Sequence, residues 1–153
     1  MHQPEVIFDK LVSDYICNWS NLETVFCPRN SLDRNALTHL SRVQGLTQLS
    51  FAPSATLPDE IASSDALLFS TLHELDLFSA TLVPVSNSLA HIQLPAVADF
   101  IVNIFSCPSK QDITSFLTAL QPSGAGDSIT RLRPDPNSLY ICHSSIGTFC
   151  TFR

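Results

Sequence analysis

The sequence has no long apolar run and no excess of positive charge. Its longest apolar stretch, Val97 to Phe105, is interrupted by Asp99 and Asn103 and is far shorter than the roughly 20 residues that a membrane-spanning helix needs. Lys and Arg number 8 against 14 Asp and Glu, which gives a net charge of −6. Because an acidic surface repels nucleic acids and anionic membranes, we expect neither as a partner.

Signals for export and for metal binding are also lacking. The N-terminus carries neither the basic segment nor the apolar segment of a signal peptide, so we expect a cytoplasmic or nuclear location. The cysteines are odd in number, and no two have the C-x-x-C spacing of a zinc site. They are Cys17, Cys27, Cys107, Cys142 and Cys150. We therefore expect no metal and no cofactor, and we interpret the cysteines as reduced, small apolar side chains.

Motifs of common enzyme classes do not occur either. The sequence contains no nucleophile elbow, zinc-protease helix, dinucleotide-binding glycine motif or phosphate-binding loop. Cys142 and His143 are adjacent, but neighbouring residues of a strand point to opposite faces, which argues against a Cys–His dyad. We expect that the protein is not an enzyme, with a small cysteine hydrolase using Cys142 or Cys150 as an alternative.

The sequence does contain a repeated pattern. Residues 22–32 read LxxVxCxxNxL and residues 129–139 read IxxLxPxxNxL, which is the leucine-rich-repeat template except at Pro134. Three segments between them keep the first three apolar positions: Leu46, Leu49 and Phe51; Leu72, Leu75 and Leu77; Val97, Phe100 and Val102. The units start at residues 22, 46, 72, 97 and 129, so their spacings are 24, 26, 25 and 32 residues. The first three spacings lie within the roughly 20–29 residues typical of such repeats.

This pattern predicts an α/β fold, specifically a leucine-rich-repeat-like solenoid of about five short parallel strands with convex helices. One domain would cover residues 1–153, with the repeat array at 22–139. Offsets 0, 3 and 5 of each unit would point inward, and Asn30 and Asn137 at offset 8 would bond backbone where the chain turns. Each unit leaves an apolar flank that the next unit covers.

Helix signals fall between the predicted strands. Within residues 1–20, Pro4 can open a helix, and Asp33 precedes apolar residues at helical spacing. Ser109 and Asp112 form a capping-box start for a helix that Gly124 and Gly126 would end. The residues from Pro58 predict a short helix through Phe69, whereas Thr81 to Pro95 has two prolines and poor periodicity. The apolar tail, residues 140–153, would cap the array, contact another chain or remain loose.

The segments Leu46 to Phe51 and Ser63 to Leu77 resemble the repeat region of fungal F-box and leucine-rich-repeat proteins. In that family an F-box docks on the Skp-type adaptor of a cullin ubiquitin ligase, and the repeats hold the substrate. The resemblance covers residues 22–139 and implies a substrate-binding module. The first twenty residues are too few for an F-box, so an adaptor is expected only if an F-box is supplied elsewhere; a truncated, non-functional fragment is the alternative.

The repeat frame also predicts which side chains form the exposed face of the sheet, because side chains alternate along a strand. Offset 2 gives Thr24, Gln48, Glu74, Asp99 and Arg131, and offset 4 gives Phe26, Ser50, Asp76, Ile101 and Arg133. The three acids would cluster, flanked by Phe78 and His73, with both arginines at one edge, and no Lys or Arg occurs between Arg42 and Lys110. We predict that a protein partner with a basic segment and an apolar anchor binds Glu74, Asp76, Asp99, Phe78, Arg131 and Arg133. A solvated acidic face with no partner is the alternative.

Overall fold

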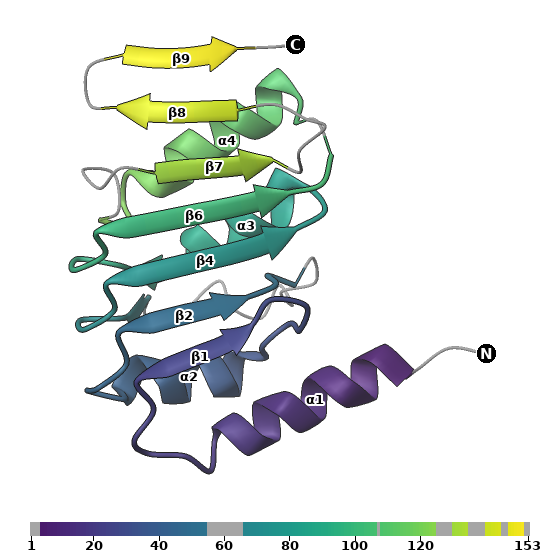
Figure 1. Cartoon of the computed structure of the whole chain (residues 1–153), viewed down its shortest axis with the longest axis vertical. Helices are drawn as coiled ribbons and strands as arrows, with labels where there is room; N and C mark the ends of the chain where they lie inside the picture. Colours follow the sequence, from purple (N-terminus) through teal and green to yellow (C-terminus); the bar gives the residue numbers. More distant parts are fainter. Residues whose placement is uncertain are drawn as a thin grey trace.

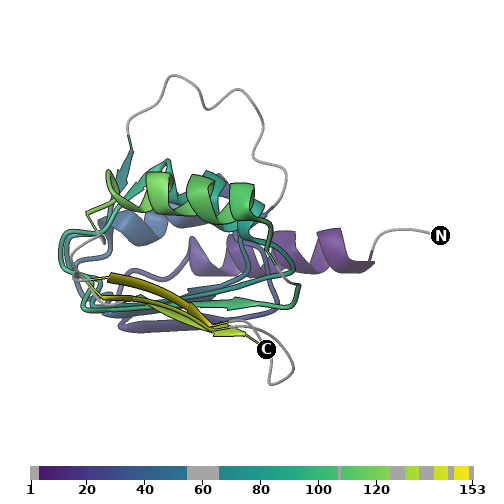
Figure 2. The same cartoon turned by 90° about the horizontal axis from the view of Figure 1, so that it is seen from above.

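The protein is an α/β structure in which helices cover one side of a mostly parallel sheet (Figures 1 and 2). The computed structural model describes residues 4–54, 66–106, 108–124, 130–134, 140–144 and 147–151, with side chains between residues 10 and 124 of these ranges. The main sheet has the strand order β1-β2-β4-β6-β7-β8-β9. Its strands are β1 (Thr24–Cys27), β2 (Gln48–Phe51), β4 (Glu74–Ser79), β6 (Asp99–Ile104), β7 (Thr130–Pro134), β8 (Tyr140–Ser144) and β9 (Gly147–Thr151).

Parallel pairing runs without interruption from β1 to β7, and its register is the central feature of the sheet. Thr24 pairs with Gln48, Gln48 with Glu74, and Glu74 with Asp99. The frame derived from the sequence aligns these same residues at offset 2, so its alignment of the first four strands is confirmed. The fifth strand differs, because Arg131 pairs with Ile101 and Arg133 with Asn103. The repeat frame aligns Arg131 with Asp99, and this prediction is wrong by two residues.

The core lies between the sheet and the helices. The inward positions of the four strands are buried, including Leu49, Leu75, Leu77, Phe100 and Val102. Residues that precede the strands, Leu46, Leu72 and Val97, are buried with them. Offsets 0, 3 and 5 therefore point inward in these strands as expected, with Leu22 and Cys27 half-buried at the end of the sheet. Ile129 and Asn137 lie outside the described residues.

Two helices begin where polar side chains can satisfy their first backbone N–H groups. Asp33 caps α2 (Arg34–Arg42) by accepting a hydrogen bond from the backbone N of Ala36. Ser109 and Asp112 form a capping box at α4 (Lys110–Leu120), and these bonds lower the pKa of Asp112. After α4 ends, Gly124 takes a φ of 79°, a conformation that favours glycine. All three features agree with the sequence-based expectation.

Helix α1 (Pro4–Ile16) also forms where the sequence predicts a helix, and it contacts α2. Helix α3 (Leu82–Leu89) forms in the segment with poor periodicity. Pro84 is the third residue of α3, where its missing N–H would have no partner within the helix, so the proline is tolerated. Most of α3 is buried, so packing rather than local signals determines it.

Two further differences concern strands that the sequence did not predict. The predicted helix from Pro58 through Phe69 is wrong at its C-terminal end. Leu67–Leu68 instead form strand β3, which pairs with β5 (Ile92–Gln93). Residues 55–65, where that helix would begin, lie outside the described residues. In the tail, β8 and β9 form an antiparallel hairpin that extends the sheet beyond β7 (Figure 1).

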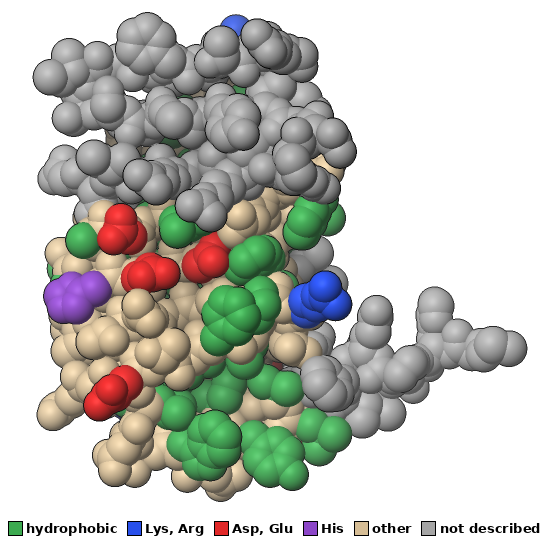
Figure 3. Space-filling view, viewed as in Figure 1, with side chains coloured by type: hydrophobic (Ala, Val, Ile, Leu, Met, Phe, Trp, Pro, Cys, Tyr) green, Lys and Arg blue, Asp and Glu red, His purple; other side chains and the backbone are tan. Residues whose placement is uncertain are grey.

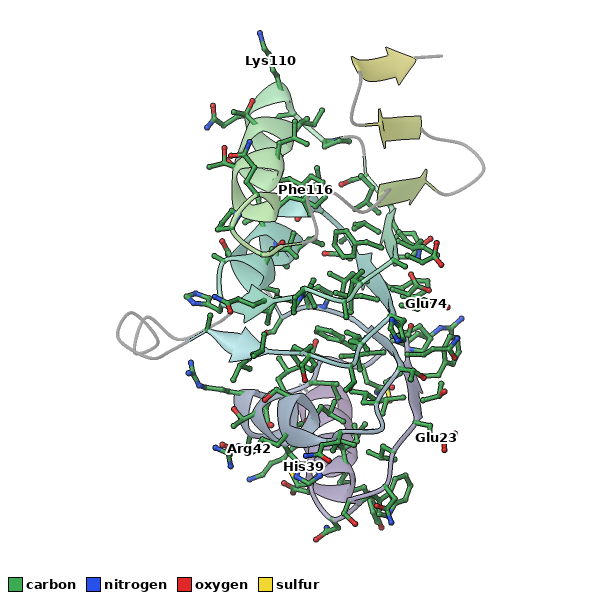
Figure 4. The ribbon with its side chains drawn as sticks, turned by 90° about the vertical axis from the view of Figure 1, so that its left-hand side faces the viewer. Glu23, His39, Arg42, Glu74, Lys110 and Phe116 are labelled. Atoms are coloured by element: carbon green, nitrogen blue, oxygen red, sulfur yellow. The ribbon has the colours of Figure 1, made fainter. Side chains whose placement is uncertain are left out.

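We expect the helical layer to depend on Phe116, which is 1% exposed and stacks on Phe100 with ring centroids 6.5 Å apart (Figure 4). Phe116→Ala should lower the free energy of unfolding by about 3–5 kcal/mol, because it leaves a cavity between α4 and β6. Urea denaturation followed by circular dichroism measures this. Phe105→Ala is the matched control, since Phe105 is 60% exposed and its loss should cost under about 1 kcal/mol. If both variants lost the same free energy of unfolding, the buried packing of Phe116 against Phe100 would be contradicted.

Candidate functional site

The face of the sheet opposite α2, α3 and α4, which we call the open face, is not covered by any described element (Figure 2). It carries a group of acidic side chains over β4 and β6 (Figure 3). Glu74 and Asp76 are half-buried and Asp99 is exposed. Glu74 points away from the helical layer (Figure 4). We call Glu74, Asp76 and Asp99 the acidic cluster.

The strand register brings the acidic cluster together. Glu74 and Asp99 are paired across β4 and β6, so their Cα atoms are about 4.8 Å apart. Asp76 lies two residues further along β4, about 6.7 Å from Glu74. The three strands β2, β4 and β6 contain no Lys or Arg. The cluster is thus a local concentration of negative charge, as the sequence predicts.

Amide side chains hold two of these carboxylates in place. The Nε2 of Gln48 donates to Oε2 of Glu74 at 3.1 Å, and Thr24 donates to Oε1 of Gln48 at 3.3 Å. The Nδ2 of Asn103 donates to Oδ1 of Asp76 at 2.6 Å. Sequence reasoning placed Thr24 and Gln48 on this face but assigned them no role, and it did not identify Asn103.

Apolar side chains lie on the same face beside the acidic cluster. Phe26 on β1 is 71% exposed, while Phe78 on β4 and Ile101 on β6 are half-buried. By strand alternation these three residues share the face of Asp76. Figure 3 shows apolar side chains next to the acidic ones.

The remaining predicted site residues are placed as follows. Arg131 and Arg133 occupy β7 at the register positions of Ile101 and Asn103, which on β6 belong to the open face. They lie one strand further from β4 than Asp99 does, and because β8 and β9 follow β7, they are not at the edge of the sheet. His73 precedes β4, is exposed, and its Nδ1 lies 3.1 Å from the carbonyl oxygen of Ala96.

Ser50 also lies on this face, and no sequence pattern singles it out. Among the described residues, the hydroxyl of Ser50 is a buried side-chain group for which no hydrogen-bond partner is found. The residue is 5% exposed and pairs with Asp76 across β2 and β4. Strand alternation places it on the open face, between Phe26 and Asp76.

Two hollows away from this face are less suited to binding a ligand. An open hollow of about 550 Å³ lies between the start of β1 and the end of α2, bordered by Glu23, His39 and Arg42 (Figure 4). The Nε2 of His39 donates to the carbonyl oxygen of Trp19 at 2.7 Å, which engages that ring nitrogen. A second, apolar space beside Leu37 and Phe51 measures about 30 Å³, too small for an organic ligand.

The described thiols are not activated. Burial raises the pKa of Cys17 and Cys27, and the charges of Asp33 and Asp14 raise that of Cys17 further. A raised pKa disfavours the nucleophilic thiolate. Both residues are half-buried. Within the described ranges there is no group of three or more His, Cys, Asp or Glu side chains able to hold a metal ion, and no helix long and apolar enough to cross a membrane. The side chains of Cys142 and Cys150 lie outside the described residues.

The fold and this face define an α/β protein with a helical layer on one side of a parallel sheet and an uncovered acidic and aromatic surface on the other. No protein-family model matches the chain, and no curated protein or solved structure shows significant similarity to it.

The unpaired hydroxyl of Ser50 has a measurable consequence. We expect Ser50→Ala to raise the free energy of unfolding by about 1 kcal/mol, because it removes a buried polar group without breaking a hydrogen bond. The matched control is Ser13→Ala, since the hydroxyl of Ser13 is buried but accepts from the backbone N of Asp33 at 3.1 Å. Ser13→Ala should lower stability by about 1–2 kcal/mol in the same urea titration. If Ser50→Ala lowered the free energy of unfolding, the absence of a hydrogen bond to the Ser50 hydroxyl would be contradicted.

Proposed function

We propose that this chain is a protein-recognition module that binds a basic segment with an apolar anchor on the open face of its sheet. The observation that carries the proposal is the acidic cluster beside Phe26, Phe78 and Ile101 on a sheet face that no described element covers.

We also propose that the strands belong to a leucine-rich-repeat-like solenoid. Equivalent backbone hydrogen bonds before successive strands support this architecture. The backbone N of Thr47 donates to Glu23 O, that of His73 to Thr47 O, and that of Ala98 to His73 O, each at 2.9 Å. The same geometry thus recurs every 24 to 26 residues. Such arrays present extended binding surfaces.

The chemistry of the face supports a protein partner over a small molecule. The acidic cluster lies on strands and not in an enclosed pocket, so a ligand gains affinity only by covering several side chains. Half-buried Phe78 and Ile101 offer apolar area, and the carboxylates offer charge that steers a cationic segment. The resemblance to F-box receptors supports a role in holding a substrate for ubiquitin transfer in the cytoplasm or nucleus, and that part of the proposal rests on the resemblance.

A peptide selection tests the proposal. From a random library, the purified chain should select peptides that combine Lys or Arg with Leu, Ile or an aromatic residue. The double variant Glu74→Gln/Asp99→Asn should bind the selected peptides about 5- to 10-fold more weakly, because two partly screened charge pairs are lost. Fluorescence anisotropy measures the affinity, and raising the salt concentration should weaken binding by the wild type more than by the variant.

The control variant removes the same charge elsewhere on the chain. Asp14→Asn/Glu23→Gln alters two exposed acids outside the acidic cluster and should leave peptide affinity within about twofold of the wild type. Equal weakening in both double variants would show that only net charge matters. Selection of peptides without basic residues would overturn the proposal.

A further inference from the structure

The acidic cluster has features that distinguish between the two basic side chains. This inference rests on the proposed function and concerns which cation the face accepts. Lysine carries a compact, strongly hydrated ammonium group, whereas arginine carries a planar fork of five donors that is more weakly hydrated.

The first feature is that the carboxylates are held in fixed orientations. Gln48 binds Glu74 through one carboxylate oxygen, and Asn103 binds Asp76 at 2.6 Å. A carboxylate can accept about four hydrogen bonds, more than the one that each amide donates. Because a rigid fork matches fixed acceptors better than a flexible point charge does, this arrangement favours a guanidinium.

The second feature is the buried hydroxyl of Ser50, which has no hydrogen-bond partner and pairs with Asp76 across two strands. This unsatisfied hydroxyl is an observation separate from the charges of the acidic cluster. It indicates a site that lacks a hydrogen-bond donor. The open-face neighbour of Ser50 on β1, Phe26, is 71% exposed and therefore has room to turn. A donor group seated beside Asp76 can then reach the hydroxyl oxygen.

The third feature is the aromatic ring of Phe78, two residues beyond Asp76 on the same face. Phe78 is half-buried, so its ring is anchored while part of it stays accessible. Guanidinium groups stack on aromatic rings, and arginine does so more often than lysine. A planar cation bound at Asp76 can therefore cover Phe78 as well.

We propose that the open face binds an arginine side chain of the partner, with the guanidinium between Asp76 and Ser50 and against the ring of Phe78. Glu74, two residues before Asp76 on β4, and Asp99, which pairs with Glu74 on β6, supply further negative charge. Gln48 and Asn103 act as positioning residues that orient the carboxylates.

Two labelled peptides test this on the whole chain: acetyl-Leu-Arg-Gly-Arg-Leu-amide and its counterpart with lysine in place of arginine. Their charge and leucine content are equal, so a difference in affinity reports the shape of the cation. We expect the arginine peptide to bind about 10-fold more tightly in fluorescence anisotropy titrations. Equal affinity for both peptides, lost in Glu74→Gln/Asp99→Asn, would overturn the arginine site and leave the basic-segment proposal standing. Binding of neither peptide would overturn both.

Substitutions locate the cation. Phe78→Leu keeps an apolar side chain but removes the ring, and Ser50→Ala removes only the hydroxyl; each should reduce the preference for arginine at least threefold. Asp76→Asn can still accept from Asn103 and should weaken the arginine peptide most. Phe105→Leu is the control, because Phe105 is exposed but follows β6 and lies outside the acidic cluster. An unchanged preference in both Phe78→Leu and Ser50→Ala would overturn the assignment.

Discussion

The parallel pairing of β1, β2, β4 and β6 in one common register is the constraint on which the rest of the structure depends. Since side chains alternate with a period of two, a slip of one residue would send a strand's buried residues to the open face. Leu49, Leu75 and Phe100 therefore pair side by side in the core, and Gln48, Glu74 and Asp99 pair on the other face. The same register that builds the core also brings the acids together.

The cost of that arrangement explains the polar side chains around the acidic cluster. Carboxylates in neighbouring strands repel each other, and half-buried ones lose part of their hydration. Gln48 and Asn103 donate hydrogen bonds to Glu74 and Asp76 and so offset part of this cost. Ser50 receives no such compensation in the structure. A partner that supplies donors and positive charge would relieve both, and this is the physical basis of our proposal that the open face binds a protein segment.

The helical layer makes this possible by covering the opposite face. Helices α2, α3 and α4 lie over the buried strand residues, and Phe116 on α4 stacks on Phe100 of β6 (Figure 4). The core is closed on this side, while the other side carries exposed side chains such as Phe26 and Asp99. The two faces of the sheet are thus different in character: one forms the core with the helices, and the other is the surface that we propose binds a partner.

The sequence by itself determined the features that depend on local patterns: the alignment of the first four strands, the start of α2 at Asp33 and the capping box at Ser109. It also identified Glu74, Asp76 and Asp99 as one group, because strand periodicity and repeat spacing suffice to place them. Only the tertiary structure decided the rest. The two-residue offset of β7, the pairing of β3 with β5, the helix containing Pro84 and the missing partner of Ser50 arise from contacts between segments distant in sequence, which local propensity does not encode.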